Sequence, residues 1–133
     1  MMPLPPELAT TEDGSLTLFA PAFGEHYHST HGARQESEHI FLRLGLLHRL
    51  EELPVTDRPL CLFEVGLGTG LNALLTKVAV EQAKRPLCYY SIERYPLGVE
   101  LANQLNYSGL PTADLRAIHE SPWGEDISLS PYF

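Results

Sequence analysis

The sequence has few cysteines, few basic residues and no long apolar run. Its 2 cysteines, Cys61 and Cys88, cannot build a disulfide framework; each begins an apolar run, where cysteine usually behaves as a small buried hydrophobe. Lys and Arg number 9 against 17 Asp and Glu, a net charge of −8, which disfavours a general nucleic-acid coat but leaves room for a local basic face. Because the chain has neither a signal peptide nor the roughly 18 consecutive apolar residues of a membrane span, we expect a cytoplasmic protein without membrane contact.

The length and composition fit one globular domain. The chain has 133 residues, of which 44% are hydrophobic and 20% charged. We expect a loose, proline-rich lead-in over residues 1–10 and one domain over residues 11–133. A turn at Asp13-Gly14, a strand over residues 15–19 and an extended piece at residues 26–29 predict a short β-hairpin. Apolar spacing then predicts a helix over residues 37–53.

A strand–turn–helix pattern follows and indicates an α/β fold with a parallel sheet. Residues 60–65 form a nearly continuous apolar run, which is typical of a strand buried on both faces. A glycine-rich turn comes next, and then a helix over residues 71–84 and a second buried strand over residues 87–92. We expect further helices from Pro96 to about Asn106 and over residues 113–120.

The glycine turn reads Glu64-x-Gly66-x-Gly68-x-Gly70, at the junction of a buried strand and a helix. Leu71 stands where the dinucleotide fingerprint needs glycine, and no Lys followed by Ser or Thr supplies a phosphate loop. The remaining pattern resembles motif I of the Rossmann-like S-adenosylmethionine methyltransferases. Glu93, at the end of the next strand, is placed to accept hydrogen bonds from the ribose hydroxyls of a nucleoside ligand.

A longer pattern narrows the resemblance. Asp13-Gly14-Ser15, Glu25-His26-Tyr27-His28-Ser29, Gly32-Ala33, Glu36-Ser37 and Phe41 precede a turn that continues as Thr69-Gly70-Leu71-Asn72. This order and spacing, over roughly residues 11–107, resembles the methyltransferase module of the MnmC/MnmD family of bacterial tRNA-modifying enzymes. The Thr69-Gly70-Leu71-Asn72 extension is the specific part, because generic methyltransferases do not require it.

The resemblance implies an activity, a cofactor and a site. Such an enzyme would use S-adenosyl-L-methionine to methylate the 5-aminomethyl group of the wobble uridine, usually 2-thiouridine, in certain tRNAs. The implied cofactor-binding residues are Glu64, Gly66, Gly68, Thr69, Gly70, Asn72 and Glu93. Candidates to line the pocket are Tyr27, Ser29 and Glu36.

The chain also departs from the family pattern. Members carry an Asp-containing D-x-F-x-P motif near the site of methyl transfer, and this motif is absent here. We therefore leave the catalytic residue unassigned and expect it beyond Phe133. The expected fold is the N-terminal half, and thus an incomplete form, of a Rossmann-like methyltransferase, preceded by the hairpin and a helix. Two parallel strands would leave open sheet edges, which invite self-association.

Other interpretations remain open. The acidic charge favours a methyltransferase for small-molecule amines, and a non-catalytic cofactor-binding or interaction fragment is a further alternative. His26 and His28 would share one face of a strand, but the spacing matches no standard zinc motif, and we predict no metal site. Arg34, Arg43, His48 and Arg49 could form a modest basic strip for tRNA on or near the first helix, but we favour a solvated helix face as the account of these residues.

Overall fold

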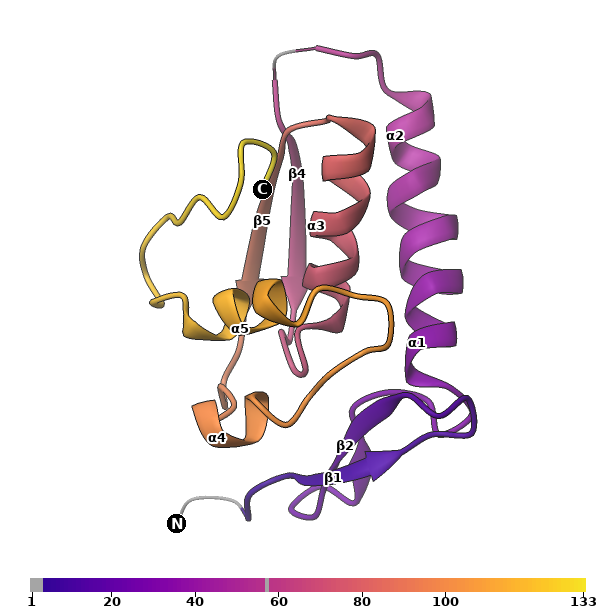
Figure 1. Cartoon of the computed structure of the whole chain (residues 1–133), viewed down its shortest axis with the longest axis vertical. Helices are drawn as coiled ribbons and strands as arrows, with labels where there is room; N and C mark the ends of the chain where they lie inside the picture. The colour runs from indigo at the N-terminus through magenta and orange to yellow at the C-terminus, as the bar shows by residue number, and fades with distance from the viewer. Residues whose placement is uncertain (1–3, 57) are drawn as a thin grey trace.

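The computed structural model of the chain describes residues 4–56 and 58–133. Figure 1 shows a small antiparallel sheet, a two-stranded parallel sheet and a long helix that runs beside helix α3. The antiparallel sheet lies beyond the carboxyl ends of the parallel strands. In chain order, the elements are β1 (Glu7–Thr10), β2 (Leu16–Ala20), β3 (Glu25–His26), α1 (Ala33–Glu36), η1 (Ser37–Leu47), α2 (His48–Glu52), β4 (Leu60–Val65), α3 (Leu71–Ala83), β5 (Leu87–Ile92), α4 (Val99–Ala102) and α5 (Thr112–Glu120).

The hairpin forms as predicted, but it begins earlier. β1 pairs antiparallel with β2, with Leu8 opposite Leu18, and β2 pairs with the short β3. The prediction of a loose lead-in is therefore wrong for residues 7–10, because pairing with the buried strand β2 orders a segment of weak local preference. Residues 1–3 of that lead-in lie outside the described residues.

The turn between β1 and β2 caps the first helix. The side chains of Thr11, Ser15 and Asp13 accept hydrogen bonds from the first three amides of α1, at 3.2, 3.0 and 3.1 Å respectively. A helix leaves these amides without partners, so the hairpin satisfies the helix start directly. Burial acts to raise the pKa of Asp13, but hydrogen bonds from Ser15, Thr11 and the Gln35 amide outweigh it and lower that pKa to about 2.

The long helix contains a π-helical centre. The helix predicted over residues 37–53 is present, but residues 37–47 follow the wider π spacing. Apolar residues chosen by α-helical spacing consequently do not share one buried face: Leu50 is buried, whereas Ile40 and Leu44 are more than half exposed.

The strand–turn–helix–strand unit is confirmed. β4 and β5 pair in parallel, with Leu60 opposite Leu87 and Glu64 opposite Ser91. The expectation that both faces are buried is wrong for the described residues, because residues of β4 alternate between partial burial and exposure. Cys61 is accordingly exposed and Cys88 is intermediate, so Cys61 is not the buried hydrophobe that its context indicated.

The last segments depart further from the sequence expectations. The helix expected from Pro96 to about Asn106 is limited to α4, since Gly98 delays its start and Leu105 turns back into the core. Helix α5 is close to its predicted range. The chain end runs beside β5, where the Leu87 amide donates to the Tyr132 carbonyl at 2.8 Å.

Two apolar clusters hold these elements around α3. One joins β2, α1, α3 and α5 through residues that include Leu18, Leu74 and Leu115. The other joins η1, α2, α3 and one face of the parallel sheet. Across residues 4–56 and 58–133, no helix is both long and apolar enough to cross a membrane.

Candidate functional site

The glycine turn connects the end of β4 to the start of α3. The Gly66 amide extends the sheet ladder by donating to the Ile92 carbonyl at 2.8 Å, and the Gly70 amide closes the turn on the Leu67 carbonyl at 3.0 Å. Gly66, Gly68 and Gly70 have φ angles of +86°, +55° and +78°. L-amino-acid side chains rarely tolerate these angles, so the turn requires glycine at each of these positions.

Two of these glycines also lie against other side chains. A Cβ at Gly68 would lie 3.0 Å from the Tyr27 ring, and one at Gly70 would lie 3.0 Å from His119 Nε2. The turn is therefore enclosed by the hairpin on one side and by α5 on the other.

Glu93 joins the end of β5 to the same turn. Its carboxylate accepts a hydrogen bond from the Gly68 amide and another from the Tyr95 amide, both at 3.0 Å. The two bonds fall on different oxygens, Oε2 and Oε1, and each oxygen can accept a second bond. A pair of neighbouring hydroxyl groups could therefore still bind this carboxylate.

Glu64 lies at the end of β4, on the covered face of the sheet. Its carboxylate accepts hydrogen bonds from Asn72 Nδ2 at 3.1 Å and from the Ser91 hydroxyl at 3.3 Å. Burial raises the pKa of Glu64 above its usual range, and the nearby charge of Glu93 acts in the same direction. A cation bound beside Glu64 would stabilise its ionised form.

Two buried polar atoms near Glu64 have no hydrogen-bond partner among the described residues, namely Asn72 Oδ1 and the Tyr89 hydroxyl. Burial and the negative charge of Glu64 raise the pKa of Tyr89. Unsatisfied buried polar atoms cost free energy and often mark a place where a ligand or water binds. Asn72 itself is among the residues that line the groove described below.

Thr69, in the centre of the turn, faces inward. Only 1% of its surface is exposed. Its hydroxyl lies 2.8 Å from His28 Nε2, and its carbonyl lies 2.7 Å from His119 Nε2. Thr69 is thus held by two histidines, and it is also among the lining residues of the first hollow described below, so its contact with the cofactor stays a prediction.

The structure brings two of the three pocket-lining candidates to the glycine turn. Tyr27 and Glu36 line the same groove as the glycine turn, whereas Ser29 is not among its described lining residues. The Ser29 amide donates to Glu36 at 2.7 Å, and its hydroxyl accepts from the His31 amide at 3.2 Å. Ser29 therefore holds the Glu36 side chain from the loop that precedes α1.

The site opens into two hollows that meet at Gly68 and Glu93. The first, of about 1160 Å³, runs between the hairpin, η1 and β4; the second, of about 670 Å³, runs along β5 towards α5. Glu25, Glu36, Glu64 and Glu93 line the first hollow, with Arg49 as its counter-charge. This acidic lining favours a cationic ligand over one that carries phosphate groups.

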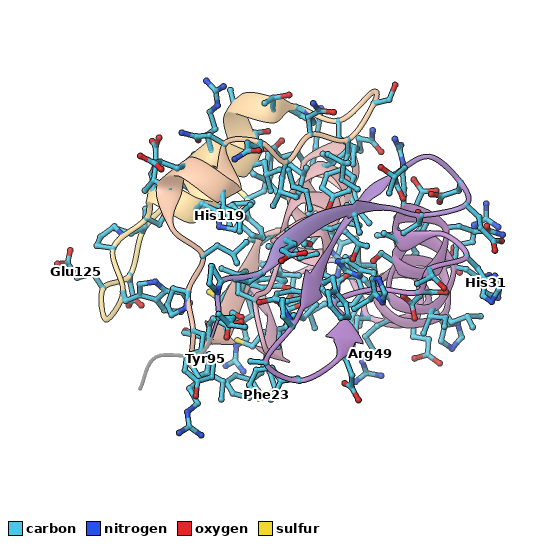
Figure 2. All side chains as sticks on the ribbon, turned by 90° about the horizontal axis from the view of Figure 1, so that it is seen from below. Phe23, His31, Arg49, Tyr95, His119 and Glu125 are labelled. Carbon is cyan, nitrogen blue, oxygen red and sulfur yellow. The ribbon has the colours of Figure 1, made fainter. Side chains whose placement is uncertain are left out.

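Aromatic rings gather at the rim of the first hollow. Figure 2 shows Phe23 and Tyr95 next to each other, and their ring centroids are 6.3 Å apart. The histidines of the hairpin do not converge on a metal site. Within the described ranges, no group of three or more His, Cys, Asp or Glu residues is arranged to hold a metal ion.

Sequence reasoning missed several residues of this site. His28 and His119 both contact Thr69, and Ser91 donates to Glu64. Ser91 could have been found from strand register, because parallel pairing places it opposite Glu64. No comparable signal marks the two histidines, which are distant from Thr69 in the sequence.

The chain is similar in sequence to known proteins. No family model matches the chain. Proteins named tRNA 5-methylaminomethyl-2-thiouridine biosynthesis bifunctional protein MnmC, from Burkholderia mallei (strain SAVP1) and Burkholderia pseudomallei (strain K96243), are 34% identical to it over 102 residues. The matches cover 73% of this chain and 14% of each relative, within its N-terminal part.

A solved structure supports the same relationship. The crystal structure of MNMC2 from Aquifex aeolicus superposes with a TM-score of 0.65 at 28% sequence identity, over 85% of this chain and 35% of that chain. The present chain thus spans a minor part of its relatives' length. It is MnmC-like and corresponds to the N-terminal portion of the proteins of that family.

Proposed function

We propose that the chain is a Rossmann-like module that binds S-adenosyl-L-methionine at the glycine turn and serves a methyltransferase. The observation that carries this proposal is the convergence of Glu64, Glu93 and three positive-φ glycines at the carboxyl ends of β4 and β5. In open α/β sheets, ligands bind at such strand ends.

The residues present fit this cofactor better than a dinucleotide. S-adenosylmethionine carries a sulfonium and an ammonium group, and the acidic lining of the first hollow suits both. The unpartnered Asn72 Oδ1 can accept from the ammonium group, beside the Glu64 carboxylate. Glu93 keeps one acceptor position on each oxygen for the two ribose hydroxyls.

The substrate we propose is tRNA, at the 5-aminomethyl group of the wobble uridine. The MnmC name of the relatives supports this choice, since it refers to 5-methylaminomethyl-2-thiouridine biosynthesis. The cofactor supplies an activated methyl group, and the protein has to align a neutral amine with it. Tyr27 and Glu36, which line the hollow next to the turn, are placed to contact the incoming nucleoside.

One observation favours a small amine as the alternative substrate. The chain is acidic, and the basic strip considered from the sequence is largely neutralised: Arg34 pairs with Glu38, and both His48 and Arg49 pair with Glu52. Clustered unpaired cations are what phosphate binding needs. A tRNA would therefore have to use other basic surface.

Methyl-transfer assays separate the alternatives. The chain, extended by the rest of the methyltransferase module that the resemblance implies, is incubated with methyl-labelled S-adenosylmethionine and with either tRNA that carries 5-aminomethyluridine or a panel of small primary amines. We expect label in the tRNA, and less of it after Glu93→Ala. Label in the small amines alone would contradict the tRNA assignment. Cofactor binding without transfer to either substrate would contradict the enzymatic assignment and favour a non-catalytic module.

A further inference from the structure

Thr69 is held from two directions. His28 follows the short strand β3 and reaches the Thr69 hydroxyl, while His119 lies near the end of α5 and reaches the Thr69 carbonyl. Both contacts are shorter than 3 Å, and Thr69 is buried. These two histidines thus connect the centre of the glycine turn to elements that precede and follow it by many residues.

We propose that His28 and His119 are positioning residues that fix the glycine turn in the shape that accepts the cofactor. This inference rests on the proposed function of the turn. The Thr69 carbonyl lies in the same peptide plane as the Gly70 amide, so fixing this carbonyl also fixes the direction of that amide, next to Gly68 in the turn. The Gly68 amide is the one that holds Glu93 in place.

The chemistry of the two contacts differs. A backbone carbonyl can only accept, so His119 Nε2 must carry a proton and donate it to Thr69 O. The threonine hydroxyl can donate or accept, so it can pair with either tautomer of His28. Burial lowers the pKa of His28, which favours a neutral ring at this position.

The glycines on each side of Thr69 fit this arrangement. Gly70 leaves room for the His119 ring, and Gly68 leaves room for Tyr27, the neighbour of His28 in the chain. Substituting either glycine would displace the same elements that hold Thr69. Glycine is therefore needed in the turn for two reasons: it adopts the positive φ angles, and it leaves space for these side chains.

The test measures cofactor affinity in histidine variants of the whole chain. Titration calorimetry with S-adenosylmethionine is performed on His28→Ala, His119→Ala and His119→Gln, with His31→Ala as the matched control. His31 lies on the same loop as His28, and its side chain is 81% exposed. Figure 2 shows His31 at the periphery, whereas His119 is partly buried.

We expect each alanine variant at His28 or His119 to weaken binding about tenfold, as the loss of one well-placed hydrogen bond would. His119→Gln should recover most of the affinity, because its amide can donate from the position of Nε2. His31→Ala should bind as the wild type does. Hydrogen exchange at the amides of residues 66–71 should accelerate only in the two alanine variants.

The outcomes distinguish a failure of the histidine contacts from a failure of cofactor binding. Normal affinity and normal exchange in both alanine variants, with a wild type that binds, would overturn the positioning role alone. Lower melting temperatures with unchanged affinity would also overturn it, because the histidines would then be structural. No binding by the wild type would overturn the proposed function and this inference together, whatever the exchange data show.

Discussion

The two faces of the β4–β5 sheet differ in what covers them. One face packs against α3 and the long helix, whereas the other is largely exposed to solvent. Strand register assigns Leu60, Leu62, Glu64, Leu87, Tyr89 and Ser91 to the covered face, and Cys61, Phe63, Val65, Cys88, Tyr90 and Ile92 to the exposed face. Both faces are predominantly apolar, so composition alone does not explain why only one is covered.

The parallel pairing of β4 and β5 was predicted correctly, whereas the burial of both faces of the sheet was not. An apolar run without alternation predicts a strand that is covered on two sides, as in parallel sheets with helices on both faces. The described residues supply helices for one side only. On the exposed face, Phe63 and Val65 are 63% and 77% exposed, so this face presents a contiguous apolar surface.

The largest expected effect comes from breaking the covered face. Leu87→Ala should lower the free energy of unfolding by about 3 kcal/mol, because the cavity would lie between the sheet and α3. Ile92→Ala, on the same strand but on the exposed face, should cost about 0.5 kcal/mol. Urea unfolding of the two variants measures both values. Equal losses would contradict the assignment of the faces.

We expect two copies of this chain to associate through the exposed face of the sheet. Its apolar surface and the outer edge of β4 both favour pairing. Phe63→Lys should weaken association about tenfold in sedimentation velocity experiments while leaving the melting temperature nearly unchanged. A wild type that stays monomeric at high concentration would show that this face and this edge do not pair.

A smaller effect should come from the carboxylate on the covered face. Because burial raises the pKa of Glu64, the folded state holds this proton more tightly than the unfolded state does. The protonated Glu64 therefore contributes its full stabilisation when the pH is below the pKa of an ordinary glutamate. This stabilisation is lost as the pH rises through the raised pKa of Glu64 in the folded state. Glu64→Gln should thus be more stable than the wild type at neutral pH, by less than the Leu87→Ala loss, and this advantage should shrink in acid. An advantage independent of pH would contradict the burial argument.

The sequence was sufficient to predict the local parts of the site. The glycines of the turn, Glu64 and Glu93 could be identified because strand ends and turns follow short-range patterns, and parallel pairing brings neighbouring strand ends together. The βαβ unit follows from the same patterns. The longer sequence pattern around the turn was also sufficient to predict the similarity to MnmC proteins.

The parts that were missed depend on contacts across the fold. The role of Thr69 follows from His28 and His119, whose positions are set by the packing of the hairpin and α5. β1 forms only because β2 offers it a partner, and the π-helical centre of the long helix has no signal in the apolar spacing. Tertiary packing decides each of these features and overrides local preference.

The central claim is that the glycine turn binds S-adenosylmethionine, and titration calorimetry tests it most directly. We expect saturable binding by the wild type that is lost in Gly68→Ala, where a Cβ would approach Tyr27 at a positive φ angle. Gly109→Ala is the control, because Gly109 also has a positive φ angle but has no atom within 4 Å of an added Cβ. Absence of binding by the wild type, or equal affinity in Gly68→Ala and Gly109→Ala, would contradict the account.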